Sequence, residues 1–335
     1  MNIYDARCVR DIYTIIKKHY HFAPSDFKIA DAPLSTFHHF NKDLRESSSS
    51  YLNFEFAYKY ADTCSHCYHI TYTGAGAEIN MYVLMDTKMT SKMKGQFFKN
   101  LYRVYLITKI YGISKPFNFY IIMNPLKRCM PTKRGDVIDV VNINGGYTYI
   151  NKNNIYIIRK EDYGKVLIHE LLHHNTTMHH QDWDDANIRR LKEHFKIHPT
   201  MLLLPNEAII ETFACILNTI FYSVEEETTG GNGFNANLKR DQEHSLLLAK
   251  KIIDKQGDGL WDEKTHSFCY IVFKTILYVY FNKFLKIYRY RNDTAMTDFL
   301  IRYSPKIYKR AEQKKQREQK PRRTAVGLKQ TVFRS

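Results

Sequence analysis

The run Lys165–His180, KVLIHELLHHNTTMHH, constrains the fold more than any other part of this chain. His169, Glu170 and His173 form the pattern His-Glu-x-x-His, and the apolar residues around them predict a helix. Residues four apart share a helix face, so the two imidazoles project side by side at the spacing that one Zn²⁺ requires. Glu170 stands where a carboxylate reaches a water on such a metal, which is the position of a general base. Burying these polar groups among apolar residues costs free energy unless they are paired or bind a metal.

Two residues compete for the third ligand position. His179 lies six residues after His173, a spacing that resembles the metzincin metallopeptidases. Metzincins place glycine where this chain has Thr176, and a β-branched residue is poorly suited to the positive φ of that turn. The other candidate is Glu207, which opens a later helix directly after Asn206. We therefore favour Glu207 and keep His179 as the alternative ligand.

The segment LLLPNEAIIETFACIL resembles the second ligand helix of the gluzincin metallopeptidases, the clan of thermolysin-like and aminopeptidase-like enzymes. The resemblance covers roughly residues 136–222. It implies that Glu207 binds Zn²⁺ while Asn206 and Glu211 act from the second shell, where a carboxylate can hold a ligand histidine by its other ring nitrogen. The interval from His173 to Glu207 is longer than in thermolysin-like enzymes. The stretch leading into the histidine motif is also loosely similar to metallopeptidases of large DNA viruses.

A site of this kind needs an electrophile for the oxyanion that develops on the substrate carbonyl. Gluzincins take a tyrosine or histidine from the helical half of the molecule. Sequence alone does not choose among four candidates: Tyr222, His244, His266 and Tyr270.

Zincins also bind an extended substrate along an edge strand that precedes the active-site helix. Residues 140–150 stand in that order in the sequence. Within them Asn144, Gly145 and Gly146 would permit close approach of a substrate backbone. The same three residues are equally typical of a simple hairpin turn.

Hydrophobic periodicity predicts an α+β fold with a zincin-like layout: a small mixed β-sheet, an active-site helix and a mainly helical second half. Three regions are expected, namely an N-terminal α/β region at 1–125, a zincin-like catalytic region at 126–304 and a basic, disordered tail at 305–335. The predicted strands are 68–73, 78–85, 117–123 and 154–159. The predicted helices include 91–111, 184–195, 239–255, 266–290 and one that begins at Pro205.

The chain has a formal net charge of +16, and residues 306–334 are rich in lysine and arginine. This balance favours acidic partners, such as an acidic peptide substrate, and nucleic acid or an anionic surface that contacts the tail. Cys64 and Cys67 form one Cys-x-x-Cys pair, which is weak evidence for a second metal site. The other cysteines are scattered, as in a protein with reduced thiols.

The beginning of the chain is amphipathic and lacks the apolar core of a signal peptide. Lysines interrupt the longest apolar-looking run, residues 267–290, so we expect a buried helix there and no membrane span. These features predict an intracellular protein, cytoplasmic or nuclear, or one packaged in a virus particle.

The expected function is therefore that of a zinc metallopeptidase, a hydrolase that uses a zinc-activated water. The alternative is a non-catalytic basic protein, associated with nucleic acid or structural in a virion, whose histidine motif is structural or degenerate. The sequence contains no nucleophile elbow, P-loop or dinucleotide fingerprint.

Overall fold

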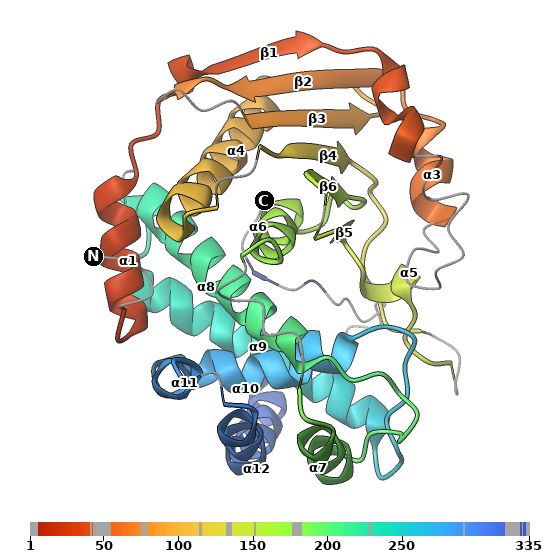
Figure 1. The fold of residues 1–335 in the computed structure, drawn as a ribbon, viewed down its shortest axis with the longest axis vertical. Helices are drawn as coiled ribbons and strands as arrows, with labels where there is room; N and C mark the ends of the chain where they lie inside the picture. Colours follow the sequence, from red (N-terminus) through yellow and green to blue (C-terminus); the bar gives the residue numbers. More distant parts are fainter. Residues whose placement is uncertain are drawn as a thin grey trace.

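A computed structural model of the chain describes residues 6–40, 42, 55–74, 79–113, 116–131, 136–150, 152–175, 183–227, 230–290, 292–318, 329, 331 and 332. The protein is α+β, as expected, with a sheet that arches over two helices and a helical half on their other side (Figure 1).

The sheet has six strands in the order β1-β2-β3-β4-β6-β5. The first three strands are antiparallel, β3, β4 and β6 run parallel, and β5 returns antiparallel to β6 at the edge. The predicted strands are confirmed with small shifts at their ends. Their bounds are β1 Phe27–Asp31, β2 His66–Tyr72, β3 Ile79–Met85, β4 Asn118–Ile122, β5 Gly146–Thr148 and β6 Asn154–Ile157.

Helices α4 and α6 lie beneath the sheet, and α8 to α12 form the helical half (Figure 1). The helix predicted to end before Gly112 is confirmed as α4, because that glycine takes the positive φ of 65° that closes the helix. The helices are α1 Val9–His19, α3 Glu55–Ala61, α4 Ser91–Tyr111, α5 Val140–Ile143, α6 Tyr163–Leu172, α7 Asp185–Phe195, α8 Pro205–Glu227, α9 Phe234–Gln256, α10 Lys274–Val279, α11 Phe281–Tyr288 and α12 Asp293–Glu318.

Helix α8 is the central helix of the helical half, and it packs against α6, α9 and α10. Among the described residues it is the one helix that is long and apolar enough to cross a membrane, and 89% of its apolar window is buried inside the protein. The core helix of a folded protein passes the same test. The packing of α8 against α6 brings Glu207 and Glu211, in the first two turns of α8, toward the histidine motif.

The expected strand at 140–150 is only partly correct. Residues 140–143 form the short helix α5, because Asp139 and Asn142 cap each other's backbone N–H groups in a capping box. The edge strand β5 begins at Gly146, and its hairpin to β6 lies after Thr148. Asn144, Gly145 and Gly146 therefore do not form the hairpin turn that their composition suggests.

The single helix expected over 266–290 is also wrong in detail. A π-helical turn at Cys269–Phe273 leads into α10, and α11 starts anew at Phe281. The carbonyl of Tyr278 accepts a hydrogen bond from the Gln242 side chain, and the ring of Tyr280 packs on Tyr303. These tertiary contacts accompany the break, which periodicity alone does not reveal.

The boundary predicted at residue 125 does not separate two domains. Strand β4, before the boundary, pairs in parallel with β6 after it, so one sheet crosses the division. One hydrophobic core also joins residues from both sides of it, including Ile16, Leu101, Leu171 and Ile216.

The expectation of a disordered tail from residue 305 is contradicted for its first part. Helix α12 continues to Glu318, because the apolar side chains of Ile307 and Ala311 lie on one face and are fully buried. Further along, Thr331 is also buried, with 1% of its surface exposed. The basic character of this region is thus compatible with docking onto the rest of the protein.

Candidate metal centre

Three donor atoms meet between helix α6 and helix α8. His169 Nε2 lies 3.2 Å from His173 Nε2 and 3.4 Å from Glu207 Oε2, and the distance from His173 Nε2 to Glu207 Oε2 is 3.6 Å. A tetrahedral zinc ion with bonds of about 2.0–2.1 Å separates its ligands by about 3.3 Å. The triangle of donor atoms therefore has the dimensions of one face of such a tetrahedron, and these three residues fit a zinc ion.

Local structure explains how two helices supply this triangle. His169 is in the last turns of α6, and His173 follows the helix with helical dihedrals, φ −59° and ψ −25°, so the two rings stay on one face. Glu207 is in the first turn of α8, where a carboxylate is favoured by the helix dipole. The packing of α8 on α6 brings Glu207 to the histidines across the long interval between them.

Glu211, one turn after Glu207, holds one of the ligand histidines. Its Oε2 atom lies 2.8 Å from Nδ1 of His169, and both side chains are buried. Since a carboxylate only accepts, His169 donates its Nδ1 proton to Glu211. Nε2 is therefore the ring nitrogen that faces Glu207 and His173 and that would bind a metal once it gives up its own proton.

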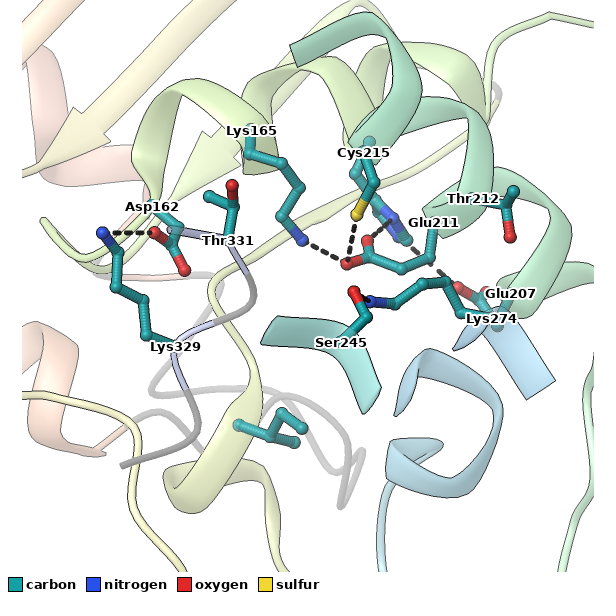
Figure 2. A network of polar contacts seen from close by, with 12 residues as sticks. Asp162, Lys165, Glu207, Glu211, Thr212, Cys215, Ser245, Lys274, Lys329 and Thr331 are labelled. Carbon is teal, nitrogen blue, oxygen red and sulfur yellow. Dashed lines mark hydrogen bonds and ion pairs between the residues drawn. The ribbon is translucent and has the colours of Figure 1, made fainter. Parts of the chain in front are cut away.

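Sequence reasoning missed Lys165, which belongs to the same arrangement. Its Nζ atom donates to Oε1 of Glu211 at 2.6 Å, and only 4% of its side chain is exposed (Figure 2). The sequence does contain a signal for this role: Lys165 stands four residues before His169 in an otherwise apolar helix. That spacing places the two side chains on one face of the helix. Glu211 is therefore a buried bridge between a lysine and a histidine of α6.

The electrostatics of the site favour a positive charge at its centre. Burial lowers the pKa of His169, but hydrogen bonds to Glu207 and Glu211 outweigh this effect and raise it to about 10. Burial raises the pKa of Glu207, yet His173 and His169 lower it to about 2. In the protein alone a proton supplies the positive charge that these carboxylates require. A metal cation could supply the same positive charge. The charges of the three residues, like their distances, therefore fit a bound metal ion.

Glu170 lies beside the triangle and faces a small pocket of about 40 Å³, which is also lined by His169, Gly145, Gly146 and Tyr270. The Glu170 side chain is buried, and desolvation raises the pKa of its carboxyl to about 7. A carboxyl with a pKa near neutrality can both accept and release a proton.

Two of the four candidate electrophiles lie near the triangle. The Tyr270 ring is 5.7 Å from the His169 ring, and the His266 ring is 6.2 Å from that of Tyr270. Burial raises the pKa of Tyr270 well above its usual value, and the nearby carboxylates act in the same direction. Its hydroxyl is therefore a hydrogen-bond donor at neutral pH.

The other two candidates have partners elsewhere in the structure. Tyr222 is fifteen residues after Glu207 on the same helix, about 22 Å along the axis, and its hydroxyl bonds Glu226. A ring nitrogen of His244 lies 2.7 Å from the carbonyl oxygen of Lys329. We therefore retain only Tyr270 and His266.

The two glycines of the expected substrate strand approach α6 closely. A Cβ atom on Gly145 would clash with the guanidinium of Arg128, and one on Gly146 would lie 2.9 Å from Val166 Cγ1. Glycine is thus required at these two positions for the edge strand to lie against α6. The carbonyl of Asn144 accepts a hydrogen bond from Arg159 Nε at 3.0 Å.

Other sequence-predicted residues have different surroundings. His179 falls outside the described residues. The Asn206 side-chain oxygen accepts a hydrogen bond from the Trp183 indole, so it links α8 to the segment before α7. Cys64 and Cys67 are buried free thiols, and among the described residues no group of three possible ligands other than His169, His173 and Glu207 lies close enough to hold a metal.

Comparisons of the chain with protein-family models, curated proteins and solved structures found no match. The function of the site is therefore inferred from its own geometry and chemistry.

Proposed function

We propose that this protein is a zinc-dependent metallopeptidase in which His169, His173 and Glu207 hold the metal and Glu170 is the general base. The observation that carries the proposal is the triangle of donor atoms, whose edges of 3.2, 3.4 and 3.6 Å fit tetrahedral zinc. Three protein ligands would leave the fourth position of a zinc ion open, which is typical of catalytic rather than structural zinc sites. A zinc ion there would lower the pKa of a water and polarise the substrate carbonyl.

The burial and the pKa of Glu170 support its proposed role as the group that moves the proton of the hydrolysis. It accepts a proton from the attacking water and delivers it to the nitrogen of the leaving amine, as the peptide C–N bond breaks. A pKa of about 7 suits both steps, because neither protonation state is strongly preferred at neutral pH. Burial of the carboxyl keeps bulk water from competing for this proton.

Tyr270 is our choice for the residue that stabilises the oxyanion. It comes from the helical half, lines the same small pocket as Glu170, and keeps its hydroxyl proton. A donor fixed before the reaction costs no reorganisation as negative charge develops on the carbonyl oxygen. His266, whose pKa is lowered by burial, is the second choice.

The edge of the sheet supports binding of an extended peptide. Strand β5 pairs with β6 on one side and is the last strand in the sheet order. A substrate backbone can add to its other side by main-chain hydrogen bonds, and the strand is adjacent to α6.

Zinc content and a single substitution test this function. We expect the purified wild-type protein to hold one zinc ion per chain, measured by elemental analysis, and to cleave members of a mixed peptide library, measured by mass spectrometry. Glu170→Gln should keep the zinc and lose activity by a factor of 100 or more, on the order expected for a general base. As a control we choose Glu193→Gln, an exposed carboxylate on α7, which should retain both.

A wild-type protein without stoichiometric zinc would contradict the proposal. Zinc retained together with no cleavage of any library member would assign the metal a structural role, which is the non-catalytic alternative.

A further inference from the structure

A second hollow, which we name the lysine pocket, lies beside the beginning of α6. It has a volume of about 560 Å³, within the range of ligand-binding sites. Its apolar part includes Met93, Phe97 and Met123, and its exposed cations are Lys92, Lys127 and Lys160. The pocket thus combines an apolar floor with a basic rim.

The acidic residues of the pocket are already neutralised. Glu161 lies 3.6 Å from the Arg128 guanidinium, and Asp162 lies 3.4 Å from the same group. Asp162 also lies 3.5 Å from Lys329 Nζ, and Figure 2 shows this pair. Within the part of the chain that the structure describes, none of the three rim lysines forms an ion pair with a carboxylate. Their charges are therefore available to an anionic ligand.

The pocket lies at the beginning of α6, and the candidate metal centre lies toward the end of the same helix. Asp162, at the start of the helix, and His169 are seven positions apart, which is two turns and about 10 Å. An extended peptide spans this distance with about three residues. A chain bound at the metal can thus place a side chain in the lysine pocket.

We infer that the lysine pocket binds an acidic segment of the peptide substrate, about three residues from the bond that is cleaved, with a neighbouring apolar side chain on its floor. This inference rests on the proposed peptidase function. The charge of the rim and the apolar floor together select acidic and apolar residues in one segment.

A residue from the end of the chain, Lys329, itself lines the pocket, and the segment around it is held by contacts to neighbouring residues outside the pocket, which favours a peptide occupant over other anions. Lys329 pairs with Asp162, and its carbonyl oxygen lies 2.7 Å from a ring nitrogen of His244. The backbone N–H of Val332 donates to the buried Asp241 at 3.1 Å. These contacts hold main chain as well as side chain.

Binding to the zinc-loaded Glu170→Gln protein tests the pocket without cleavage. The probes are two fluorescent peptides of equal length, one with the segment Asp-Glu-Leu-Asp and one with Asn-Gln-Leu-Asn, followed by anisotropy. We expect tighter binding of the acidic peptide and about tenfold weaker binding after Lys92→Glu with Lys160→Glu. The control pair, Lys18→Glu with Lys28→Glu, makes the same charge change at exposed positions away from the pocket and should leave the affinity within twofold of its starting value.

Equal affinity for the two peptides, or equal weakening by both variant pairs, would overturn the inference. Displacement of the acidic peptide by lower concentrations of a short single-stranded oligonucleotide would also overturn it, in favour of a nucleic-acid site.

Cleavage by the wild-type protein separates this inference from the peptidase proposal. If the Glu170→Gln protein binds the acidic peptide through the rim lysines but the wild type cleaves nothing, the pocket stands and the peptidase function fails. If the wild type cleaves both peptides with the same kcat/KM and the lysine variants do not change it, the peptidase stands and the pocket inference fails.

Discussion

His169 Nδ1 and Glu211 Oε2 lie 2.8 Å apart across the contact between α6 and α8. The other carboxylate oxygen of Glu211 lies 2.6 Å from Lys165 Nζ, so one side chain of α8 is tied to two residues of α6. The hydrogen bond holds a proton on Nδ1 of His169 and turns Nε2 toward the other donors. The orientation of a proposed metal ligand is thus set by a neighbouring helix.

Replacing Glu211 with glutamine should weaken zinc binding about 10- to 100-fold, because a neutral amide oxygen accepts the His169 proton less strongly than a carboxylate and leaves Nε2 a poorer ligand. The same change should destabilise the fold by about 3 kcal/mol, since it leaves Lys165 as a buried cation without a carboxylate. Competition with a zinc-binding dye measures the affinity, and urea unfolding measures the stability.

A double substitution separates these two effects. Lys165→Met combined with Glu211→Gln should recover part of the lost unfolding free energy, because no unpaired charge remains, but it should not recover zinc affinity. Recovery of zinc affinity in the double variant would show that Glu211 acts through Lys165 rather than through His169.

Removing Glu207 tests the choice of third ligand. Glu207→Gln should abolish stoichiometric zinc binding. In the wild type, excess zinc at a hundred times its Kd should stabilise the fold by about 2.7 kcal/mol, and the variant should lose this effect. Thermal unfolding with zinc and with a chelator provides the measurement. If the variant keeps zinc and its stabilisation, Glu207 is not a ligand and His179 becomes the candidate.

We expect Glu225, which lies away from the candidate metal centre, to make an acid-sensitive contribution to stability. Its carboxylate accepts hydrogen bonds from Arg103 Nε and Nη2 at 2.8 and 2.7 Å and from the Tyr20 hydroxyl at 2.8 Å. Burial raises the pKa of Glu225, but Arg103 and Tyr20 outweigh it and hold it below the usual 4.5. The stabilisation is therefore complete above pH 4.5 and is lost as the pH falls through the lower pKa of the folded protein.

We expect Glu225→Gln to cost about 3 kcal/mol at pH 7, because Arg103 stays buried without its partner. Below pH 4 the difference from the wild type should shrink. Melting temperatures between pH 3 and pH 7 test this, with Glu193→Gln as the matched exposed control. A difference that stays constant over the whole range would mean that the carboxylate charge is not the cause.

The docked residue Thr331 provides a prediction for the end of the chain. Asp241 is fully buried and accepts hydrogen bonds from Thr331 Oγ1 at 2.8 Å and from the Tyr278 hydroxyl at 2.9 Å. Thr331→Val should lower the unfolding free energy by about 1–3 kcal/mol, since the bond to a charged acceptor is lost. Thr14→Val, at an exposed helix position, should change it by less than about 0.5 kcal/mol. Equal effects of the two changes would indicate that the segment is not docked in solution.

Local sequence determined the elements around the site. Alternation predicted β2 and β3, and helical periodicity with Gly112 at its end predicted α4. The spacing of His169 and His173 determined that two imidazoles share a helix face, because the helical repeat alone fixes that relation. These features depend only on residues close together in the chain.

Only the tertiary structure decided which distant residues meet. The contact of α8 with α6 brings Glu207 and Glu211 to the histidines and buries Lys165 beside them. Helix α12 likewise packs through its buried apolar face against the rest of the chain. Thr331 is held by a hydrogen bond to the buried carboxylate of Asp241. Periodicity describes one element at a time, whereas the identity of a buried partner depends on how separate elements pack.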